Sequence, residues 1–191
     1  MSSSKVFIVI TGRPGVGKTT LVKRVVSKLV HDGIRVAGFY CPEVREGGKR
    51  IGFQITSIDG TIRGWLARIS GCDGPRVGRY TTCYEAEKVV EEALRNSDKA
   101  DLVVIDEIGP IELRLRGIRS QILRVLKSLK PGIFVAHYRL SDQIITPLLR
   151  RYGYWFEVTL ENRDQLVNKI YSLTKNILAE RQRDKPRHSI D

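Results

Sequence analysis

The sequence is poor in cysteine and contains no long apolar run. Its three cysteines, Cys41, Cys72 and Cys83, leave an odd count and form no C-x-x-C pair. We therefore expect buried or free thiols in a reducing cytosol and no disulfide framework. No apolar stretch approaches the roughly 20 residues that a membrane-spanning helix needs. The residues before the first apolar run leave no room for a signal-peptide core, so the expected location is the cytoplasm, with no membrane partner.

Acidic residues are also scarce: the sequence has 21 Asp and Glu but 33 Lys and Arg. The formal net charge is therefore +12. Such a balance favours polyanionic partners such as nucleotides, nucleic acid or phosphorylated metabolites, although solubility explains it equally well. The length of 191 residues and the 41% of apolar side chains predict one domain with a single buried core. We assign that domain to residues 1–180 and expect residues 181–191 to form a frayed polar tail.

What the sequence does contain is a phosphate-binding loop. An apolar run at residues 6–10 leads into Gly-x-x-x-x-Gly-Lys-Thr and then into an amphipathic helical pattern, which is typical of a Walker A motif. Glycines let the backbone N–H groups approach phosphate oxygens, and the helix N-terminus adds partial positive charge. We expect Lys18 to contact the β- and γ-phosphates and the Thr19 hydroxyl to bind Mg²⁺. The predicted nucleotide-binding residues are Gly12, Arg13, Pro14, Gly15, Val16, Gly17, Lys18, Thr19 and Thr20.

The rest of the chain alternates strand and helix patterns. Apolar runs at residues 34–40, 102–105, 133–136 and 154–158 predict strands, and apolar residues recur at helical spacing between them. This alternation predicts an α/β fold with a doubly wound, mainly parallel sheet and right-handed crossovers. Ligands of such sheets bind at the carboxyl ends of the strands.

An antiparallel β insertion at about residues 43–69 interrupts this alternation. Alternating side chains on both sides of a Gly-Gly pair predict a hairpin at residues 43–58. We expect the hairpin to cover the phosphate site or to form a wall for a phosphoryl acceptor. Residues 70–80, which are rich in Gly and contain Pro, predict a loop.

Two short motifs predict helix N-termini that are capped by side chains. Thr82 with Glu85 has the spacing of a capping box, and Asn162 with Gln165 has the same spacing before the last helical pattern. We therefore expect helices to begin at these two places.

Acidic residues follow the apolar strand at residues 102–105. Asp106 has the position of a Walker B aspartate, which would hold Mg²⁺ opposite Thr19. Glu107 would orient and deprotonate the water that attacks the γ-phosphate. Glu112 has two equal interpretations, one as a functional acid and one as an acid that stabilises a helix N-terminus.

Longer motifs go beyond the Walker pattern: GRPGVGKTT at residues 12–20, EVREGGKRIGF at 43–53, VIDEIGPIE at 104–112 and VT-x-x-NR at 158–163. Together they resemble the small thermophilic nucleoside-triphosphatases, known in animals as the cancer-related nucleoside-triphosphatase, over nearly residues 5–178. The resemblance implies a RecA-like P-loop fold and slow, Mg²⁺-dependent hydrolysis of ATP, GTP, CTP and UTP to nucleoside diphosphate and phosphate. It also implies that Arg163 contacts the nucleotide. The Walker motifs themselves make Lys18 and Glu107 the expected catalytic residues. Tyr138 separates His137 from Arg139, where the family commonly has His-Arg, so no transition-state arginine is assigned to Arg139.

Two other functions remain open. A P-loop kinase would pass the γ-phosphate to a small acceptor held by the hairpin and by residues 70–80. A nucleotide-switched protein would bind RNA or DNA through the basic face of residues 116–130. A solvated helix face is the commoner meaning of such a stripe, so nucleic acid is not the favoured partner. The oligomeric state is left open.

Overall fold

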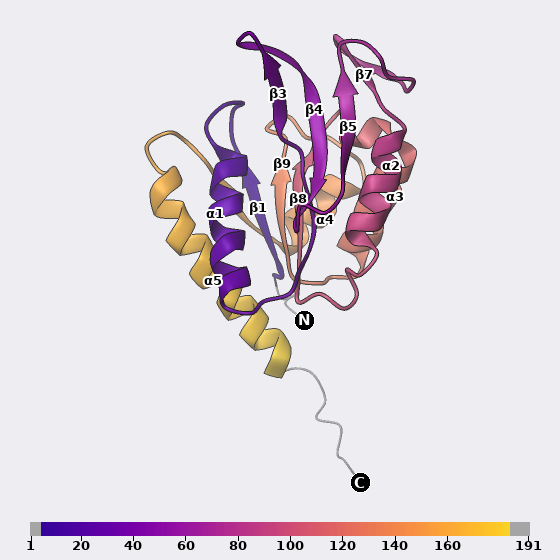
Figure 1. The fold of residues 1–191 in the computed structure, drawn as a ribbon. Coiled ribbons are helices and arrows are strands. Elements are labelled where there is room, and N and C mark those ends of the chain that lie inside the picture. The colour runs from indigo at the N-terminus through magenta and orange to yellow at the C-terminus, as the bar shows by residue number, and fades with distance from the viewer. Residues whose placement is uncertain (1–4, 184–191) are drawn as a thin grey trace.

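A mixed sheet forms the centre of the fold, and a computed structural model describes it over residues 5–183 with ten strands (Figure 1). The strands are β1 (Phe7–Thr11), β2 (Val36–Tyr40), β3 (Glu43–Glu46), β4 (Lys49–Ser57), β5 (Arg63–Arg68), β6 (Arg76–Val77), β7 (Tyr80–Thr82), β8 (Leu102–Ile108), β9 (Gly132–Ala136) and β10 (Gly153–Glu157). The helices are α1 (Lys18–His31), α2 (Glu85–Leu94), the short 3₁₀ helix η1 (Glu112–Arg114), α3 (Arg116–Lys127), α4 (Ile145–Tyr152) and α5 (Arg163–Arg183).

Half of the sheet is parallel, in the order β10-β1-β9-β8-β2. Helices α1 and α5 cover one face of these strands, and α2, α3 and α4 cover the other (Figure 1). The buried strands read as continuous apolar runs because both of their faces are covered. The predicted doubly wound, mainly parallel α/β fold is confirmed.

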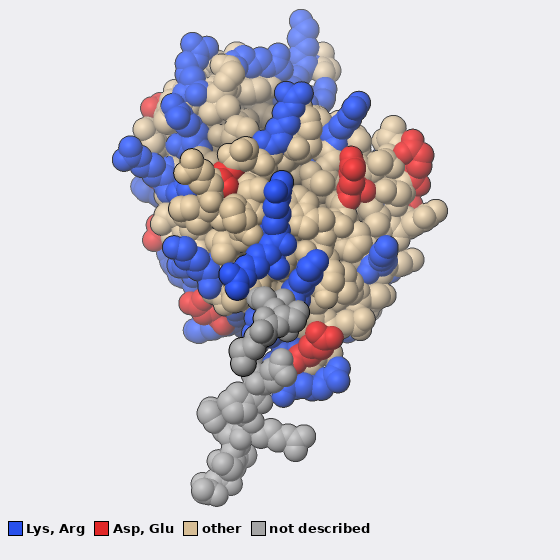
Figure 2. Space-filling model, turned by 180° about the vertical axis from the view of Figure 1, so that it is seen from behind, with Lys and Arg blue, Asp and Glu red and all other residues tan. Residues whose placement is uncertain are grey.

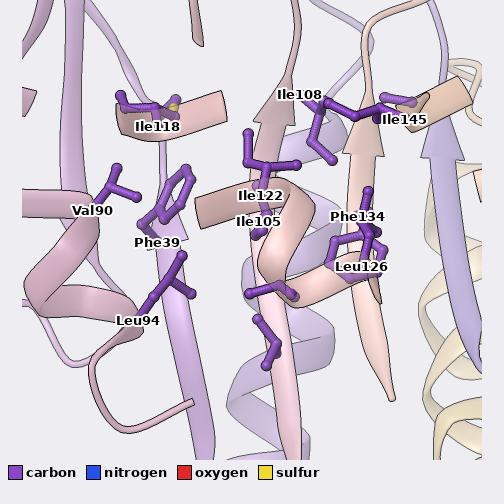
Figure 3. Close-up of a cluster of buried hydrophobic side chains, with 14 of the residues drawn as sticks. Phe39, Val90, Leu94, Ile105, Ile108, Ile118, Ile122, Leu126, Phe134 and Ile145 are labelled. Carbon is purple, nitrogen blue, oxygen red and sulfur yellow. The ribbon is translucent and has the colours of Figure 1, made fainter. Parts of the chain in front are cut away.

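Each face of the parallel half has its own apolar core. On the side of α2 and α3, the strand residues Phe39, Ile105 and Phe134 meet residues such as Leu94 and Ile122 from the helices (Figure 3). These five side chains are fully buried. Each burial of this kind stabilises the fold by about 1.5–3 kcal/mol. The two cores hold the parallel strands, and therefore their carboxyl ends, in fixed positions.

The other strands form an antiparallel extension, defined here as β3 to β7. Strand β4 pairs antiparallel with β2 and with β3, and β5, β7 and β6 continue the sheet outward. In Figure 1 these strands rise at the same end of the sheet as the loop between β1 and α1. The predicted hairpin is confirmed as β3 and β4. The extension therefore stands beside the phosphate-binding loop.

The prediction of a loop at residues 70–80 is wrong in part. Two short strands, β6 (Arg76–Val77) and β7 (Tyr80–Thr82), form a second small hairpin within and just after it. The turn at Gly78 was visible in the sequence, but strands of two and three residues carry no readable alternation.

The prediction of unpaired cysteines is also wrong for two of the three. Cys72 and Cys83 form a disulfide across 11 positions, whereas Cys41 is free and buried as expected. The spacing of Cys72 and Cys83 matches no short motif, so only the fold of the β6–β7 hairpin reveals that the two thiols meet. The bond joins the segments that precede and follow this hairpin, just before the start of α2.

Both predicted capping motifs are wrong in detail. The Thr82 hydroxyl donates to the Pro75 carbonyl, and a Glu85 carboxylate oxygen accepts the Trp65 N–H, so no side chain caps α2. The Asn162 side chain accepts from the Thr159 N–H and donates to the Glu157 carbonyl. Thr82 and Glu85 bond to distant residues, whereas Asn162 bonds within the turn just before α5, so neither pair forms the predicted capping box.

The last helix, α5, continues to Arg183, beyond the expected end near residue 180. The rest of the predicted tail, residues 184–191, lies outside the described residues. Within residues 5–183, no helix has both the length and the apolar character that crossing a membrane requires. The assignment of residues 1–180 to a single domain stays a prediction.

Candidate active site

The loop between β1 and α1 ends at a helix that no side chain caps. Gly17 precedes α1 with a φ of 98°, and no side chain accepts from the first N–H groups of this helix. The Lys18 ammonium group donates to the carbonyls of Gly12 (3.0 Å) and Arg13 (3.3 Å) and so folds over the loop. Uncapped N–H groups beside a lysine form a site for an anion such as phosphate.

Gly12 of this loop is required by its surroundings, and Gly17 is required chiefly by its positive φ. A Cβ on Gly12 would lie 2.5 Å from the Val158 carbonyl oxygen, which is too close for any other residue. A Cβ on Gly17 would lie 3.3 Å from a terminal guanidinium nitrogen (Nη1) of Arg163. Val158 also donates its N–H to the Thr11 carbonyl (2.8 Å), so the chain after β10 holds the loop closely.

Asp106 lies behind the start of α1. It is 1% exposed, and burial raises its pKa to about 6 although a hydrogen bond from Thr19 and the charge of Lys18 oppose the shift. Its Oδ2 atom is buried and has no hydrogen-bond partner. A buried, unpartnered carboxylate oxygen next to a hydroxyl suits a hard cation.

The donor set fits Mg²⁺ better than a metal that needs an all-protein cage. Among residues 5–183, no group of three His, Cys, Asp or Glu side chains could hold a metal ion. Mg²⁺ instead takes one or two protein ligands and completes its shell with water and substrate phosphates. Asp106 and Thr19 are the two protein groups that could hold it.

Glu107 and Glu112 form a pair of carboxylates around Gly109. A Cβ on Gly109 would lie 3.1 Å from Oε2 of Glu112 and 3.3 Å from Oε1 of Glu107. Burial raises the pKa of Glu107 to about 7, and Lys18 opposes this shift. Burial and then the charge of Glu107 raise the pKa of Glu112 to about 8. Such values near neutral pH allow a carboxylate to exchange protons.

A pocket of about 550 Å³ opens in front of these groups. The phosphate-binding loop and the start of α1 line one side, Glu107 at the end of β8 and Glu112 in η1 line the floor, and the extension lines the other side, since β8 lies between β1 and the extension in the sheet. The lining residues from the loop and helix are Pro14, Gly15, Gly17, Lys18, Thr19 and Thr20. Glu107, Glu112 and His137 line the floor. The predicted role of the hairpin as a wall of the phosphate site agrees with this geometry.

Five predicted site residues do not line the pocket. One of them is Asp106, which is buried behind the start of α1. Gly12 is buried beneath the loop, Val16 packs against the core between α1 and α5, and Arg13 contributes its carbonyl to Lys18. Arg163 lines a separate small cavity of about 150 Å³ with Gly17 and Thr20. This cavity is on the α5 side of the loop, so Arg163 could reach a different part of a nucleotide from Lys18.

The sequence reasoning did not single out the residues that the extension contributes. Arg50 and Phe53 come from β4, and Arg79 and Tyr80 come from the β6–β7 hairpin. The first two belong to the EVREGGKRIGF motif, which was the available signal. Arg79 and Tyr80 lie in the segment predicted as a loop, and only the fold brings them to the pocket.

Arg139 does not line the pocket. Its guanidinium lies over the Tyr138 ring, 5.0 Å from the centroid, while His137 lines the floor. Burial and then the charges of Lys18 and Arg139 lower the pKa of His137. Tyr138, the residue that interrupts the His-Arg pair, is therefore the residue on which this arginine stacks.

Comparisons with known proteins identify the family of this chain. The sequence model of a family described as NTPase matches residues 7–171. The nucleoside-triphosphatase THEP1 of Hyperthermus butylicus is 58% identical over 174 residues, covering 91% of this chain and 93% of the relative. The protein of the same name from Methanopyrus kandleri is 41% identical over 177 residues, covering 91% of this chain and 98% of the relative.

Two solved structures share the fold. The crystal structure of THEP1 from the hyperthermophile Aquifex aeolicus superposes with a TM-score of 0.77 at 30% identity and covers 88% of this chain and 99% of that chain. The solution structure of a human cancer-related nucleoside triphosphatase gives a TM-score of 0.69 at 32% identity and covers 91% of this chain and 98% of that chain. With its phosphate-binding loop and acids in this arrangement, the chain belongs to the THEP1 family of P-loop nucleoside-triphosphatases.

Proposed function

We propose that this protein hydrolyses nucleoside triphosphates to nucleoside diphosphates and phosphate in a Mg²⁺-dependent reaction. The observation that carries the proposal is the buried, unpartnered Oδ2 of Asp106 directly behind Thr19, at the uncapped start of α1. The relatives named as nucleoside-triphosphatases support the same reaction. The cytoplasm, which supplies these substrates, is the proposed location.

The loop binds and orients the triphosphate. Backbone N–H groups at the start of α1 donate to phosphate oxygens, and Lys18 leaves its carbonyl partners to contact the β- and γ-phosphates. Asp106 and Thr19 would hold Mg²⁺, which neutralises charge on the β- and γ-phosphate oxygens when it is bound. Because Asp106 is buried, its carboxylate is fixed before the substrate arrives.

Glu107 is the proposed general base. It lies between Asp106 and the open pocket, where it can orient a water molecule and take its proton as the water oxygen attacks the γ-phosphorus. Glu112 lies next to Glu107 across Gly109 and can share that proton. The bond between the γ-phosphorus and the bridging oxygen breaks, and the diphosphate leaves.

Slow turnover and broad base specificity belong to the same proposal. An arginine on the γ-phosphate contributes about 10³–10⁵-fold in related enzymes. Arg139 stacks on Tyr138, and the pocket arginines Arg50 and Arg79 already contact Glu43 and the Tyr80 hydroxyl, so no arginine is assigned to the γ-phosphate. The assigned groups contact phosphates and metal, so they do not distinguish ATP, GTP, CTP and UTP. Arg163 is the proposed contact on the other side of the loop.

Phosphate release from each of the four nucleoside triphosphates, titrated with Mg²⁺, tests the proposal. Thr19→Ala should raise the Mg²⁺ concentration for half-maximal rate and lower the rate, whereas Thr20→Ala, its neighbour on α1, should leave the Mg²⁺ titration unchanged. Identical titrations for Thr19→Ala and the unmodified protein would remove Thr19 from the metal site. Absence of phosphate release would contradict the function.

The basic helix face gives little support to a nucleic-acid function. Arg119 forms an ion pair with Asp142 (3.0 Å), and Arg124 donates to the Leu94 carbonyl and the Ser97 hydroxyl. Figure 2 shows Lys and Arg side chains spread over the back of the molecule with acidic residues between them. Several of these basic groups therefore serve the fold, and we retain hydrolysis as the proposed function.

A further inference from the structure

We propose that β10, the strand at one edge of the sheet, pairs with β10 of a second copy of this chain and so forms a two-fold symmetric dimer. The proposal goes beyond hydrolysis, because it assigns a partner to a surface that does not line the nucleotide pocket. β10 (Gly153–Glu157) ends the order of the sheet and pairs with β1 alone among the described strands. Its outer side is therefore open to another strand.

The backbone of β10 offers hydrogen-bonding groups on this outer side. The Val6 N–H donates to the Tyr152 carbonyl (2.9 Å), and the Val158 N–H donates to the Thr11 carbonyl (2.8 Å). Because backbone groups alternate in direction along a strand, the even positions between 152 and 158 face β1 and the odd positions face away. The outward N–H groups without a partner strand in residues 5–183 include those of Trp155 and Glu157.

A two-fold axis at Trp155 gives an antiparallel register that uses these groups. Trp155 meets its own copy, and the two residues exchange N–H and carbonyl bonds. The Glu157 N–H meets the Gly153 carbonyl of the second copy. The two sheets then continue into each other across the axis.

The side chains of β10 match one another in this register. Trp155 is 41% exposed, and its indole N–H donates to the Leu149 carbonyl (3.3 Å), so its ring lies on the α4 face of the sheet. The ring meets the same ring of the second copy. On the opposite face, Tyr154, which is 37% exposed, meets Phe156 of the second copy. Aromatic pairs across neighbouring strands stabilise a sheet.

The two ends of β10 carry opposite charges. Arg150, in the last turn of α4, lies at the amino end and lines a cavity of about 360 Å³ together with Trp155. Glu157 is exposed at the carboxyl end. Within the part of the chain that the structure describes, neither charged side chain forms an ion pair. An antiparallel partner brings its own Glu157 to the end that carries Arg150, which favours a second copy as the occupant.

Two other edges of the sheet have features that discourage pairing. Strand β6 has two residues, of which one is Arg76. Strand β3 pairs with β4 and has the sequence Glu-Val-Arg-Glu. Short strands and charged residues commonly protect the edges of natural sheets. β10 has five residues with three aromatic residues in succession, so it lacks this protection.

The mass of the protein in solution is the first test. Sedimentation equilibrium between about 1 μM and about 1 mM should show monomers converting to dimers as the concentration rises. Trp155→Lys places two lysines opposite each other at the axis and should give a monomer throughout. Tyr84→Lys makes the same change at an exposed aromatic residue next to α2 and should keep the dimer.

A charge exchange tests the register. Arg150→Glu and Glu157→Arg should each weaken dimerisation by about tenfold, because the axis repeats the reversed contact. The double variant restores opposite charges and should dimerise within about threefold of the unmodified protein. Restored dimerisation also shows that the single variants had not lost affinity through misfolding.

Hydrogen exchange tests the backbone pairing directly. The amides of Trp155 and Glu157 should exchange fast in dilute protein and slowly in concentrated protein. The amides of Tyr154 and Phe156, which face β1, should be protected at both concentrations.

The proposal fails if the protein is a monomer at every concentration. A dimer that persists in Trp155→Lys, or charge variants that do not compensate each other, would place the interface elsewhere and would also overturn it. Equal exchange of the Trp155 amide at both concentrations would exclude strand pairing. Phosphate release is not measured in these experiments, so they are independent of the proposed hydrolysis.

Discussion

The parallel half of the sheet and the antiparallel extension face the same pocket with different chemistry. The parallel half presents backbone N–H groups, one lysine and a set of carboxylates, all held by two apolar cores. The extension presents arginine and aromatic side chains on strands that lie outside the five parallel ones. The parallel half therefore carries the groups proposed for phosphoryl chemistry, whereas the extension adds cations and aromatic rings to the same pocket.

The largest expected effect is on the parallel side. Lys18→Ala should lower kcat by about 10²–10³-fold, because it removes a positive charge from the developing transition state. Steady-state phosphate release measures this change. Lys28→Ala, on the same helix but in contact with Asn168 of α5, is the matched control and should retain the rate. Comparable rates for both variants would contradict the division between the two halves.

A second prediction concerns the stability of the extension. Reduction of the Cys72–Cys83 disulfide, which closes a short loop, should lower the free energy of unfolding by up to about 3 kcal/mol. Hydrogen exchange should accelerate in β6 and β7 and stay unchanged in β1 and β8. Thermal unfolding and exchange with and without reductant measure both effects. If hydrogen exchange accelerated equally in all strands, the two halves would not differ in local stability.

The free energy of unfolding should depend on pH through Glu112, which is buried in η1 after β8. Because the folded protein raises the pKa of Glu112 to about 8 from 4.5, it retains a proton that the unfolded chain loses. The free energy of unfolding should therefore fall as pH rises from about 5 to about 8 in the absence of Mg²⁺, by on the order of 2 kcal/mol.

Glu112→Gln keeps the shape of the side chain and removes its titration. This variant should reduce the dependence between pH 5 and 8 to the part that Asp106 and Glu107 contribute, and the exposed Glu91→Gln should leave it unchanged. Thermal unfolding in the presence of a chelator across this range gives the comparison. An unchanged slope in Glu112→Gln would assign the dependence to other groups.

The sequence predicts the parallel half far better than the extension. Walker A spacing, the run of residues 102–105 before Asp106 and the alternation of strands with helices all report on local geometry, and each was confirmed in the fold. A continuous apolar strand and a phosphate-binding loop need no knowledge of distant residues. Their chemistry is therefore readable from a single segment.

The extension depends on contacts between distant segments. Cys72 meets Cys83 and Arg79 meets Arg50 only after β4, β5 and β7 have paired. Glu85 bonds to the Trp65 N–H instead of capping its own helix, for the same reason. Local patterns cannot anticipate such pairings, so the wall opposite the phosphate site was predicted as a hairpin but not residue by residue.

The smallest expected effect lies on the far side of the parallel half. Charge reversal of the exposed residues Arg116 and Lys127, which line no pocket described above, should leave phosphate release unchanged with and without mixed RNA at low salt. If this face bound nucleic acid, the affinity would fall steeply with ionic strength, and the slope of log affinity against log salt concentration would be smaller in the variant. Faster phosphate release from the unmodified protein in the presence of RNA would indicate that this face has a function in nucleic-acid binding.

The central claim is that Asp106 holds the metal while Glu107 activates water. Parallel nucleotide-binding and single-turnover measurements on Asp106→Asn and Glu107→Gln test it most directly. Glu107→Gln should keep Mg²⁺-dependent nucleotide affinity and lose about 10²–10⁴-fold in rate, since general-base catalysis has that magnitude. Asp106→Asn should lose Mg²⁺-dependent affinity and rate together. A Glu107→Gln protein that hydrolyses normally, or that loses binding as Asp106→Asn does, would contradict the assignment.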